Sequence, residues 1–562
     1  MTDIDLRAVP FGLDADGIAW VEQTLAAMST QQKIGQVLCL YMLRPDVPEW
    51  IDWLRERGIE PGGVMVTMRT PEASAHDTRL LQESSVVPLL VAGNLESGTV
   101  NFLRGTEAFG NPMQIGASGD PEHARRLAVH CSRAGNAAGV NWAFAPVIDL
   151  TISPANPITN TRAFGRDPGL VGRLGSAYVR EMEGRGIATS PKHFPGDGVD
   201  DRDQHLVTTC NDLDEGEWDA QFGSAYREVI ASGARTIMVG HIRQRALSRA
   251  LVPGIRDRDI LPATLAPELL QGVLRERLGF NGMIVTDNTA MAGFTTAMPR
   301  REGLPRALAA GNDMVLANLD VETDFAILCE AAGTDALPMA RLDDAVRRVL
   351  ATKASIGLHR STDRSDAEGP DPRQEGAWRA ELAAASMTVT KNTDGILPVA
   401  ARQGMRTLVY VIGDEPTFYD PTPPLAPRFA DGLRARGMEV EVRTVPVPDA
   451  TVAGAERLHE QFDLCVYFAD LRFAGNTNGL RVHWAPPQGP DAPRHTATLP
   501  TVLLSVADPY LLQDMPMVRA AINGYTPTAA TVDAALAVLF GEAVARGTAP
   551  SDPFAGRWDA AL

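Results

Sequence analysis

Eight short apolar runs recur between residues 37 and 318, and helix-like segments lie between them. The runs are VLCLY from 37, GGVMVT from 62, PLLVAGN from 88, VNWAFAPVID from 140, ATSPKHF from 188, TIMVGH from 236, GMIVTD from 282 and MVLAN from 314. Each run is short and rich in β-branched or other apolar residues, which is typical of a buried strand. The sequence therefore predicts eight strands in this part of the chain.

Helical periodicity fills intervals between these runs. One pattern repeats apolar residues at 3.6-residue spacing and stops at Gly233, namely Trp218, Phe222, Ala225, Val229 and Ile230. A second begins at about Thr264 and carries an apolar face up to Gly279, which is a plausible helix terminator. Strands that alternate with helices pair in parallel, so this region is predicted to be an α/β fold.

Eight strand–helix units predict a (β/α)₈ TIM-type barrel, with a doubly wound open sheet as the competing arrangement. Polar residues favour the barrel because they fall at or just beyond the ends of the apolar runs. They are Asn94, Glu96, Asp149, Lys192, His193, His241, Asp287 and Asn318. In a barrel, the carboxyl ends of the strands meet on one rim, where active sites are built.

A charged segment without apolar periodicity, HRSTDRSDAEGPDPRQE, follows the barrel pattern and is predicted to be a linker over residues 359–375. Strand-like runs then resume as TLVYVIG from 407, VEVRTV from 440, LCVYFA from 464 and TVLLSVADPY from 501. We therefore predict a catalytic barrel domain over 1–358 and a smaller α/β sandwich domain over 376–562.

Composition limits the classes of function. The chain has 562 residues, 44% of them apolar and 22% charged, with a formal net charge of −18. That charge argues against a nucleic-acid or anionic-membrane binder, because phosphate groups would be repelled. No run approaches the ~20 apolar residues of a membrane-spanning helix. The N-terminus lacks a secretory pattern and the five cysteines have no short pair spacing, so a cytoplasmic protein is expected.

Two segments carry the strongest candidates for chemistry. Asp287 ends the apolar run GFNGMIVTD and would be held rigidly as a nucleophile or general base, although an aspartate there can also cap the next helix. His205 lies two residues after Asp203 in the segment KHFPGDGVDDRDQH. An aspartate that accepts one imidazole N–H fixes the tautomer and leaves the other nitrogen for proton transfer.

The same segment permits a second interpretation, a divalent-metal site. His193, Asp197, Asp200, Asp201, Asp203 and His205 are all possible ligands. Their spacing matches no ligand template, and Lys192 would oppose a cation, so no metal and no organic cofactor is predicted. Lys192, His193 and Arg162 can instead donate hydrogen bonds to a polar ligand.

These segments resemble glycoside hydrolase family 3, and within it the bacterial β-N-acetylglucosaminidase branch. KHFPG followed by Asp203 and His205 looks like the substrate-binding and acid/base loop of that branch, and GFNGMIVTDNTAM looks like its nucleophile segment. FAPVIDL with NPITNTRAFGRDP, VAGNLESG, SMTVTKNTDGILPV and TVLLSVADPYLLQDMP extend the resemblance over nearly the whole chain. By the resemblance, Asp287 would be the nucleophile and His205, held by Asp203, the acid/base. The sugar would be bound by Asn94, Glu96, Arg162, Lys192, His193, His241 and Met291.

Two positions depart from the pattern of that branch. Asp197 stands where a second histidine is common, in KHFPGDG, and NLESG with Asn94 and Ser97 stands where DxEGG is common. The GDG run also occurs among the family's β-glucosidases. These departures bear on which sugar hydroxyls are recognised.

The resemblance implies a retaining, exo-acting β-N-acetylhexosaminidase that cleaves terminal β-linked N-acetylglucosamine, with a carbohydrate as its only predicted partner. A family 3 β-glucosidase, or a phosphorylase in which phosphate replaces water, uses the same residues. A neutral histidine as acid/base permits phosphate because it does not repel an anion. A metal-dependent barrel hydrolase and a sugar-binding protein without turnover are the alternatives from other classes. The sequence makes no prediction of oligomeric state.

Overall fold

The chain forms two compact units. The computed structural model describes residues 4–316, 319–363, 368–417, 420–448, 450–472 and 479–562, so that Asn318 and part of the predicted linker, 364–367, lie outside the described residues. The first unit comprises 1–106, 124–150 and 171–370, and the second comprises 107–123, 151–170 and 371–562. Two segments that fall within the predicted range 1–358 thus pack with the C-terminal residues. The predicted domain limits stay a prediction.

Eight parallel strands form the centre of the first unit. They are β1 (Leu38–Tyr41), β2 (Gly63–Met65), β3 (Leu90–Gly93), β4 (Trp142–Ala143), β5 (Ala188–Thr189), β7 (Thr236–Val239), β9 (Met283–Thr286) and β10 (Val315–Leu316). Six of them pair in the order β10-β1-β2-β3-β4-β5, and β7 pairs with β9. Parallel bridges from Phe194 to Val239 and from Val285 to Met314 join these two groups. The ring is therefore closed, and the predicted barrel is confirmed.

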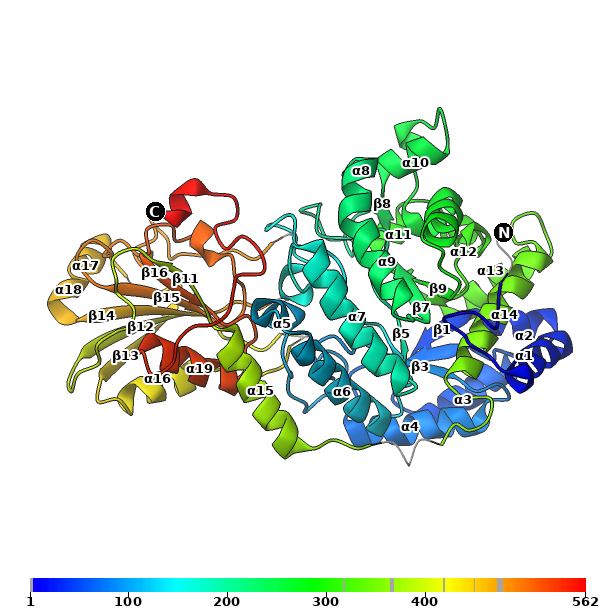
Figure 1. The fold of residues 1–562 in the computed structure, drawn as a ribbon, viewed down its shortest axis with the longest axis horizontal. Coiled ribbons are helices and arrows are strands. Elements are labelled where there is room, and N and C mark those ends of the chain that lie inside the picture. Colours follow the sequence, from blue (N-terminus) through cyan, green and yellow to red (C-terminus); the bar gives the residue numbers. More distant parts are fainter. Residues whose placement is uncertain (1–3, 317–318, 364–367, 418–419, 449, 473–478) are drawn as a thin grey trace. The chain divides into compact units, whose positions relative to one another are not determined.

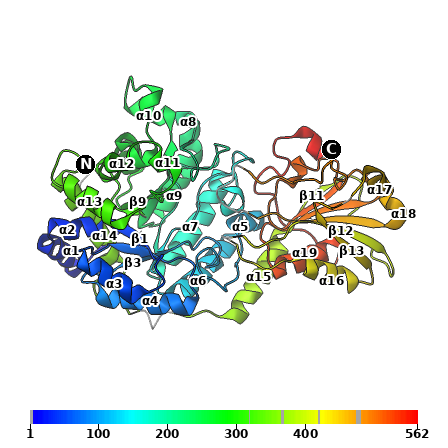
Figure 2. The ribbon, with the colours of Figure 1, turned by 180° about the vertical axis from the view of Figure 1, so that it is seen from behind.

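Helices lie around the outside of this ring, as Figures 1 and 2 show. They are α1 (Ala15–Ala27), α2 (Thr30–Gln36), α3 (Val47–Glu56), α4 (Pro71–Ser84), α6 (Pro121–Ala137), α7 (Pro168–Gly184), α8 (Glu215–Trp218), α9 (Ser224–Ala231), α10 (Arg245–Leu251), α11 (Ala292–Thr295), α12 (Arg300–Ala310), α13 (Val321–Ala331) and α14 (Met339–Ser355). The first three residues of α6 and of α7 belong to the second unit. A two-residue parallel pair, β6 (Thr209–Cys210) with β8 (Ile242–Arg243), lies outside the ring.

The predicted helix ends agree with the backbone. Gly233 and Gly279 follow the helical segments with φ of 97° and 68°, conformations that glycine adopts without a steric penalty. The helix predicted from about Thr264 starts later, as a π-helical segment at Glu268, after a 3-10 turn over Ala263–Leu265. Pro267 explains the delay, because the residue before a proline is disfavoured in the helical conformation.

The second unit contains a six-stranded sheet with helices on both faces, which confirms the predicted α/β sandwich. Its order is β11-β16-β15-β14-β12-β13, with only β11 antiparallel to its neighbour. The strands are β11 (Thr388–Asn392), β12 (Arg406–Gly413), β13 (Glu439–Val445), β14 (Leu464–Asp470), β15 (Thr501–Ser505) and β16 (Ala520–Asn523). The helices are α5 (Pro112–Ser118), α15 (Pro372–Ser386), α16 (Ala426–Arg434), α17 (Val452–Glu456), α18 (Leu458–Gln461) and α19 (Ala529–Leu539).

Alternate residues of β12 serve the two faces of this sheet. Val409 and Val411 join a core with α16 and α19, whereas Leu408, Tyr410 and Ile412 join a second core with α18. A strand that is buried on both faces has a nearly continuous apolar sequence, which is why the sequence pattern identified β12.

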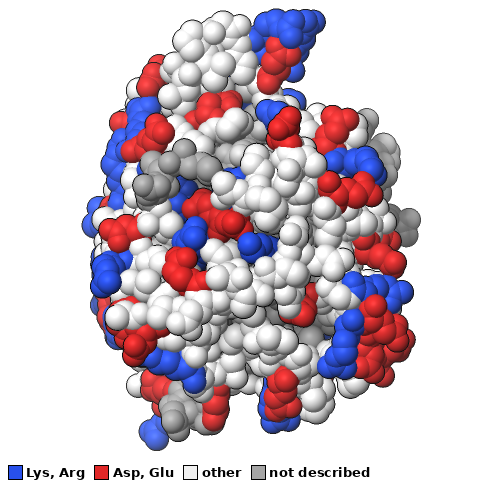
Figure 3. Space-filling model, turned by 90° about the vertical axis from the view of Figure 1, so that its right-hand side faces the viewer, with Lys and Arg blue, Asp and Glu red and all other residues white. Residues whose placement is uncertain are grey.

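No helix within the described ranges is long and apolar enough to cross a membrane. On the face drawn in Figure 3, acidic and basic side chains lie beside one another rather than in a patch of one sign.

Candidate active site

The carboxyl ends of the barrel strands bring several predicted residues to one rim. Asp287 follows β9, His193 follows β5, Asn94 follows β3 and His241 follows β7. Because the strands are parallel and the ring is closed, these ends face the same side.

Backbone groups hold both the peptide N–H and the carboxylate of Asp287. Its own N–H donates to the Val239 carbonyl at 2.8 Å, and Oδ1 accepts the Asn288 N–H at 2.6 Å. Burial acts to raise the pKa of the Asp287 carboxyl, but three nearby imidazoles and the Asn288 N–H outweigh it and hold that pKa below the ordinary value. The imidazoles belong to His193, His241 and His205. Asp287 is thus an ionised carboxylate at neutral pH, and its side chain stays 14% exposed.

His193 faces this carboxylate. Its Nδ1 donates to Asp149 Oδ2 at 2.7 Å, and its Nε2 lies 3.9 Å from Asp287 Oδ2. Asp149 Oδ1 also accepts the backbone N–H groups of His193 and Asp197, at 3.0 and 2.7 Å. A fully buried carboxylate therefore fixes both the ring and the backbone of this loop.

His205 and Asp203 form the predicted pair. Asp203 Oδ1 accepts both the Nδ1–H and the backbone N–H of His205, each at 2.7 Å. The Asp203 side chain is fully buried, whereas that of His205 is 31% exposed. Since Nδ1 is engaged and the side chain is partly exposed, Nε2 is the nitrogen that can exchange a proton with a ligand.

The loop that carries His205 packs directly on the segment that follows Asp287. The Ala292 N–H donates to the His205 carbonyl at 3.0 Å, and the Gly293 N–H donates to the Gln204 carbonyl at 3.1 Å. Backbone hydrogen bonds therefore join the segment that follows the Asp287 carboxylate to the loop that carries the His205 imidazole.

Lys192, Glu96 and Asn94 form a polar group between the ends of β5 and β3. Lys192 Nζ lies 2.7 Å from Glu96 Oε1 and donates to Asn94 Oδ1 at 3.2 Å. Lys192 and Glu96 are 3% and 2% exposed. Ammonium and carboxylate side by side present both donors and acceptors, as recognition of sugar hydroxyls requires.

The other residues predicted to bind the sugar lie in different environments. His241 is fully buried, and burial lowers its pKa. Met291 lies between Asp287 and α11 and is 5% exposed. Arg162 belongs to the second unit, where it ends a 3-10 turn over Asn160–Arg162 and donates to the Ile158 carbonyl at 3.3 Å. Its role in sugar binding stays a prediction.

Acidic residues of the segment 197–205 bind different side chains rather than one common site. Asp197 Oδ2 accepts from Gln204 Nε2 at 3.1 Å, and Asp200 binds the Arg202 guanidinium through both oxygens. Among the described residues, no three histidine, cysteine or acidic side chains come together in a way that could hold a metal ion.

The sequence placed Asp149 at the rim without assigning it a role, and it did not identify Gln204, Thr264 and Asn288 as residues that support this site. Asp149 had a signal as the end of the fourth apolar run. The other three are neutral amide or hydroxyl residues without a local pattern that marks them.

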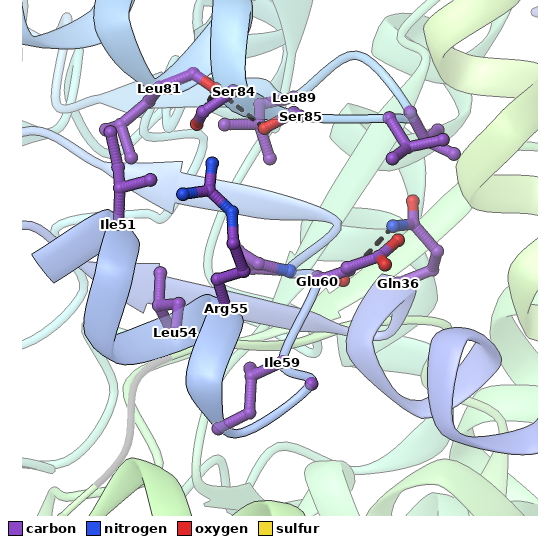
Figure 4. A pocket seen from close by; sticks show the side chains of 14 residues that line it. Gln36, Ile51, Leu54, Arg55, Ile59, Glu60, Leu81, Ser84, Ser85 and Leu89 are labelled. Carbon is purple, nitrogen blue, oxygen red and sulfur yellow. Dashed lines mark hydrogen bonds between the residues drawn. The ribbon is translucent and has the colours of Figure 1, made fainter.

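A cavity of about 280 Å³ lies at the other end of the barrel, and its lining appears in Figure 4. Gln36, Pro61 and Leu89, which line it, lie one or two residues before the strands β1, β2 and β3. The other labelled lining residues come mainly from α3 and α4. This cavity is separate from the rim that carries Asp287.

Comparison with known proteins decides the family. The model of the glycosyl hydrolase family 3 N-terminal domain matches residues 30–352. The chain belongs to glycosyl hydrolase family 3. It is a glycoside hydrolase, and the resemblance found in the sequence is confirmed.

Three similar proteins match 93% or more of the chain. A protein of Cellulomonas fimi named beta-N-acetylglucosaminidase/beta-glucosidase is 42% identical over 575 residues, which cover 100% of both chains. A solved structure of the beta-glucoside phosphorylase BglX is similar with a TM-score of 0.90 and 35% identity, covering 99% of each chain. A family 3 beta-N-acetylglucosaminidase from Paenibacillus sp. str. FPU-7 shares the fold with a TM-score of 0.78 at 24% identity, over 93% of this chain and 99% of that one.

Proposed function

We propose that this family 3 enzyme cleaves terminal β-linked N-acetylglucosamine by a retaining, two-step reaction, and that it also accepts β-glucosides. Asp287 is the nucleophile and His205 the acid/base, held by Asp203. The single observation that carries this proposal is the rim itself, where backbone hydrogen bonds join the segment after an ionised Asp287 to the loop of a partly exposed imidazole whose Nδ1 is held by Asp203.

In the first step, a carboxylate oxygen of Asp287 attacks the anomeric carbon. The bond to the leaving oxygen breaks, and that oxygen takes the proton from His205 Nε2. In the second step, a water oxygen attacks the anomeric carbon and gives a proton to Nε2, and the bond to Asp287 breaks. Two inversions give net retention.

The sugar is bound by the polar group around Lys192, with His193 at the same rim. Lys192 and His193 are held by Glu96 and Asp149 before any ligand arrives. Such preorganisation lowers the entropic cost of binding. The dual name of the Cellulomonas fimi relative supports activity on both sugars.

Replacing the nucleophile tests the proposal. Asp287→Asn should lower turnover of a nitrophenyl N-acetylglucosaminide by roughly 10⁴-fold, because the amide is a poor nucleophile. Asp201→Asn, at an exposed position of the acid/base loop, is the matched control and should retain turnover. Mass analysis of wild-type protein treated with a 2-fluoroglycoside should find the sugar on Asp287. Undiminished turnover by Asp287→Asn would reject the mechanism.

Phosphate in place of water is a second candidate function. Two observations favour it: the acid/base is an imidazole, which does not repel an anion, and a relative at 35% identity is a beta-glucoside phosphorylase. Paired initial rates on nitrophenyl glucoside and N-acetylglucosaminide, with and without phosphate, separate the alternatives. Release of a sugar 1-phosphate identifies a phosphorylase, and free sugar at an unchanged rate identifies a hydrolase.

We also propose a cytoplasmic location. None of the five cysteines forms a disulfide bond within the described residues, and three of them are buried. Thiols persist in a reducing compartment. Cell fractionation with an antibody would test this.

A further inference from the structure

His241 lies between the two segments that carry the proposed catalytic groups. Its ring is buried, and both ring nitrogens have hydrogen-bond partners: Nε2 is 3.0 Å from the Asn288 carbonyl oxygen, and Nδ1 is 3.0 Å from Thr264 Oγ1. A ring whose two nitrogens are engaged by the protein has none left for a sugar hydroxyl.

The partners fix where the proton of this ring lies. A carbonyl oxygen only accepts, so Nε2 carries the hydrogen and donates it to Asn288. In the neutral ring, Nδ1 then accepts, and the Thr264 hydroxyl must donate. Burial, which lowers the pKa of His241, keeps the ring in this neutral form.

The peptide groups of Asn288 are held on either side. Its N–H donates to Asp287 Oδ1 at 2.6 Å, and its carbonyl accepts from His241. Its side chain is bound as well, since Oδ1 accepts the Ala290 N–H at 2.8 Å and Nδ2 donates to Tyr41 Oη at 3.4 Å. Rotation of the His241 ring would therefore displace the group that holds the Asp287 carboxylate.

The backbone of His241 reaches the other segment. Its N–H donates to Gln204 Oε1 at 3.0 Å, and Gln204 lies between Asp203 and His205. Gln204 Nε2 is in turn bound to Asp197 Oδ2. One residue thus connects the nucleophile to the acid/base loop.

We propose that Thr264, His241 and Asn288 form a positioning chain that sets the carboxylate of Asp287, and that His241 ties this chain to the acid/base loop through Gln204. His241 is then a positioning residue rather than a sugar ligand. This inference rests on the proposed function, because it concerns the geometry of the same reaction.

The test removes the hydroxyl that orients the ring. Thr264→Val keeps the shape of the side chain but cannot donate to Nδ1, whereas Thr264→Ser can. The probe is a 2-fluoroglucoside with a dinitrophenolate leaving group, which needs no proton from His205. Its rate of covalent labelling, followed by intact-protein mass, therefore reports the nucleophile alone.

We expect wild-type protein to be labelled at Asp287, and Thr264→Val to be labelled roughly 10- to 100-fold more slowly, since misplaced reacting atoms cost this much. Thr264→Ser should restore labelling to within about threefold of wild type. Thr352→Val is the matched control: Thr352 is also fully buried and its hydroxyl donates to the Arg348 carbonyl, within α14. It should be labelled like wild type.

A second variant separates positioning from sugar binding. His241→Gln should slow labelling while leaving the inhibition constant of free N-acetylglucosamine within about twofold of wild type, because no sugar contact is lost. Labelling of Thr264→Val at the wild-type rate would overturn the positioning chain. Inhibition of His241→Gln by free N-acetylglucosamine that weakens in parallel with its labelling rate would overturn it as well. Both results would leave Asp287 as the nucleophile. Wild-type protein that is never labelled at Asp287 would overturn the proposed function and the chain with it.

Discussion

At the scale of single residues, some polar side chains of the candidate site are partly exposed and others are fully buried. The side chains of Asp287 and His205 retain 14% and 31% exposure, whereas the carboxylates of Asp149 and Asp203, which hold His193 and His205, retain none. A buried carboxylate is stable only when it is paired and hydrogen-bonded. Asp149 accepts hydrogen bonds from the His193 imidazole and from two backbone N–H groups, and Asp203 Oδ1 accepts the imidazole and backbone N–H of His205, so the reactive members can face a ligand.

Asp203→Asn isolates the contribution of the buried charge beside His205. The amide oxygen can still accept the Nδ1–H, but it no longer stabilises the imidazolium that forms when His205 takes a proton. We expect turnover of a glycoside with a poor leaving group to fall by roughly 10²- to 10⁴-fold, the usual contribution of general acid–base catalysis.

A dinitrophenyl glycoside should behave differently with the same variant. Its first step needs no acid, but the second still needs a base, so the glycosyl-enzyme accumulates and a burst of dinitrophenolate is expected in stopped-flow traces. Asp212→Asn, at an exposed position, is the control. An equal loss on both substrates without a burst would show that Asp203 does not act through His205.

At the scale of elements, the apolar runs were sufficient to predict all eight barrel strands, because a buried parallel strand is apolar on both faces. The strands β11 and β16 were not predicted. β11 lies at the edge of the sheet and is only partly buried, and β16 consists of Ala520–Asn523, in which only Ile522 is β-branched. In both, pairing with distant strands decides the structure, and local sequence carries little of that information.

The candidate site shows the same contrast between residues that the local sequence predicts and residues whose roles depend on distant partners. Charged residues at strand ends could be predicted, since the barrel gathers these ends on one rim. Gln204, Thr264 and Asn288 could not, because their roles depend on partners 23 to 47 residues away, as in the bonds of His241 to Thr264 and to Asn288. Nothing in the local pattern selects these partners.

Gly293, the second residue of α11, tests how closely this helix must approach the acid/base loop. A Cβ there would lie 2.6 Å from the Gln204 carbonyl oxygen and 2.9 Å from His241 Cβ. Gly293→Ala should therefore separate the two segments and lower kcat sharply, with a loss of stability of about 1–3 kcal/mol from overpacking. Steady-state kinetics and thermal unfolding check this.

Gly184→Ala serves as the control for that variant. Gly184 is the last residue of α7, and a Cβ there meets nothing within 4 Å. Alanine at this position should leave kcat unchanged and should not destabilise the protein. Normal activity of Gly293→Ala would contradict the close approach of α11 to the loop.

At the scale of the barrel as a whole, the two ends of the ring differ in what their polar groups do. Lys353 of α14 is fully buried near the amino-terminal end, and its Nζ donates to Gln36 Oε1 at 2.6 Å. Gln36 Nε2 donates onward to the Glu60 carbonyl at 3.2 Å. This pair lies at the end opposite the proposed active site, so its consequence is for stability.

Burial lowers the pKa of Lys353 to about 7 from 10.5 in the unfolded chain. The unfolded state therefore binds more protons between these values, and wild-type stability falls as pH decreases from 10.5 to about 7. Lys353→Met removes this penalty while keeping the length of the side chain. Its stability relative to wild type should be highest below pH 7 and should shrink by about 1.4 kcal/mol per pH unit as pH rises above that value.

Urea unfolding of both proteins between neutral and alkaline pH measures this difference. Loss of the hydrogen bond to Gln36 lowers the stability of Lys353→Met by a constant amount, so the slope with pH, rather than the absolute gain, identifies the lysine. Lys33→Met, which removes an ion pair with Asp343 at 2.7 Å, is the control without a buried ammonium. A stability difference between wild type and Lys353→Met that does not change with pH would show that Lys353 is not desolvated in the folded protein.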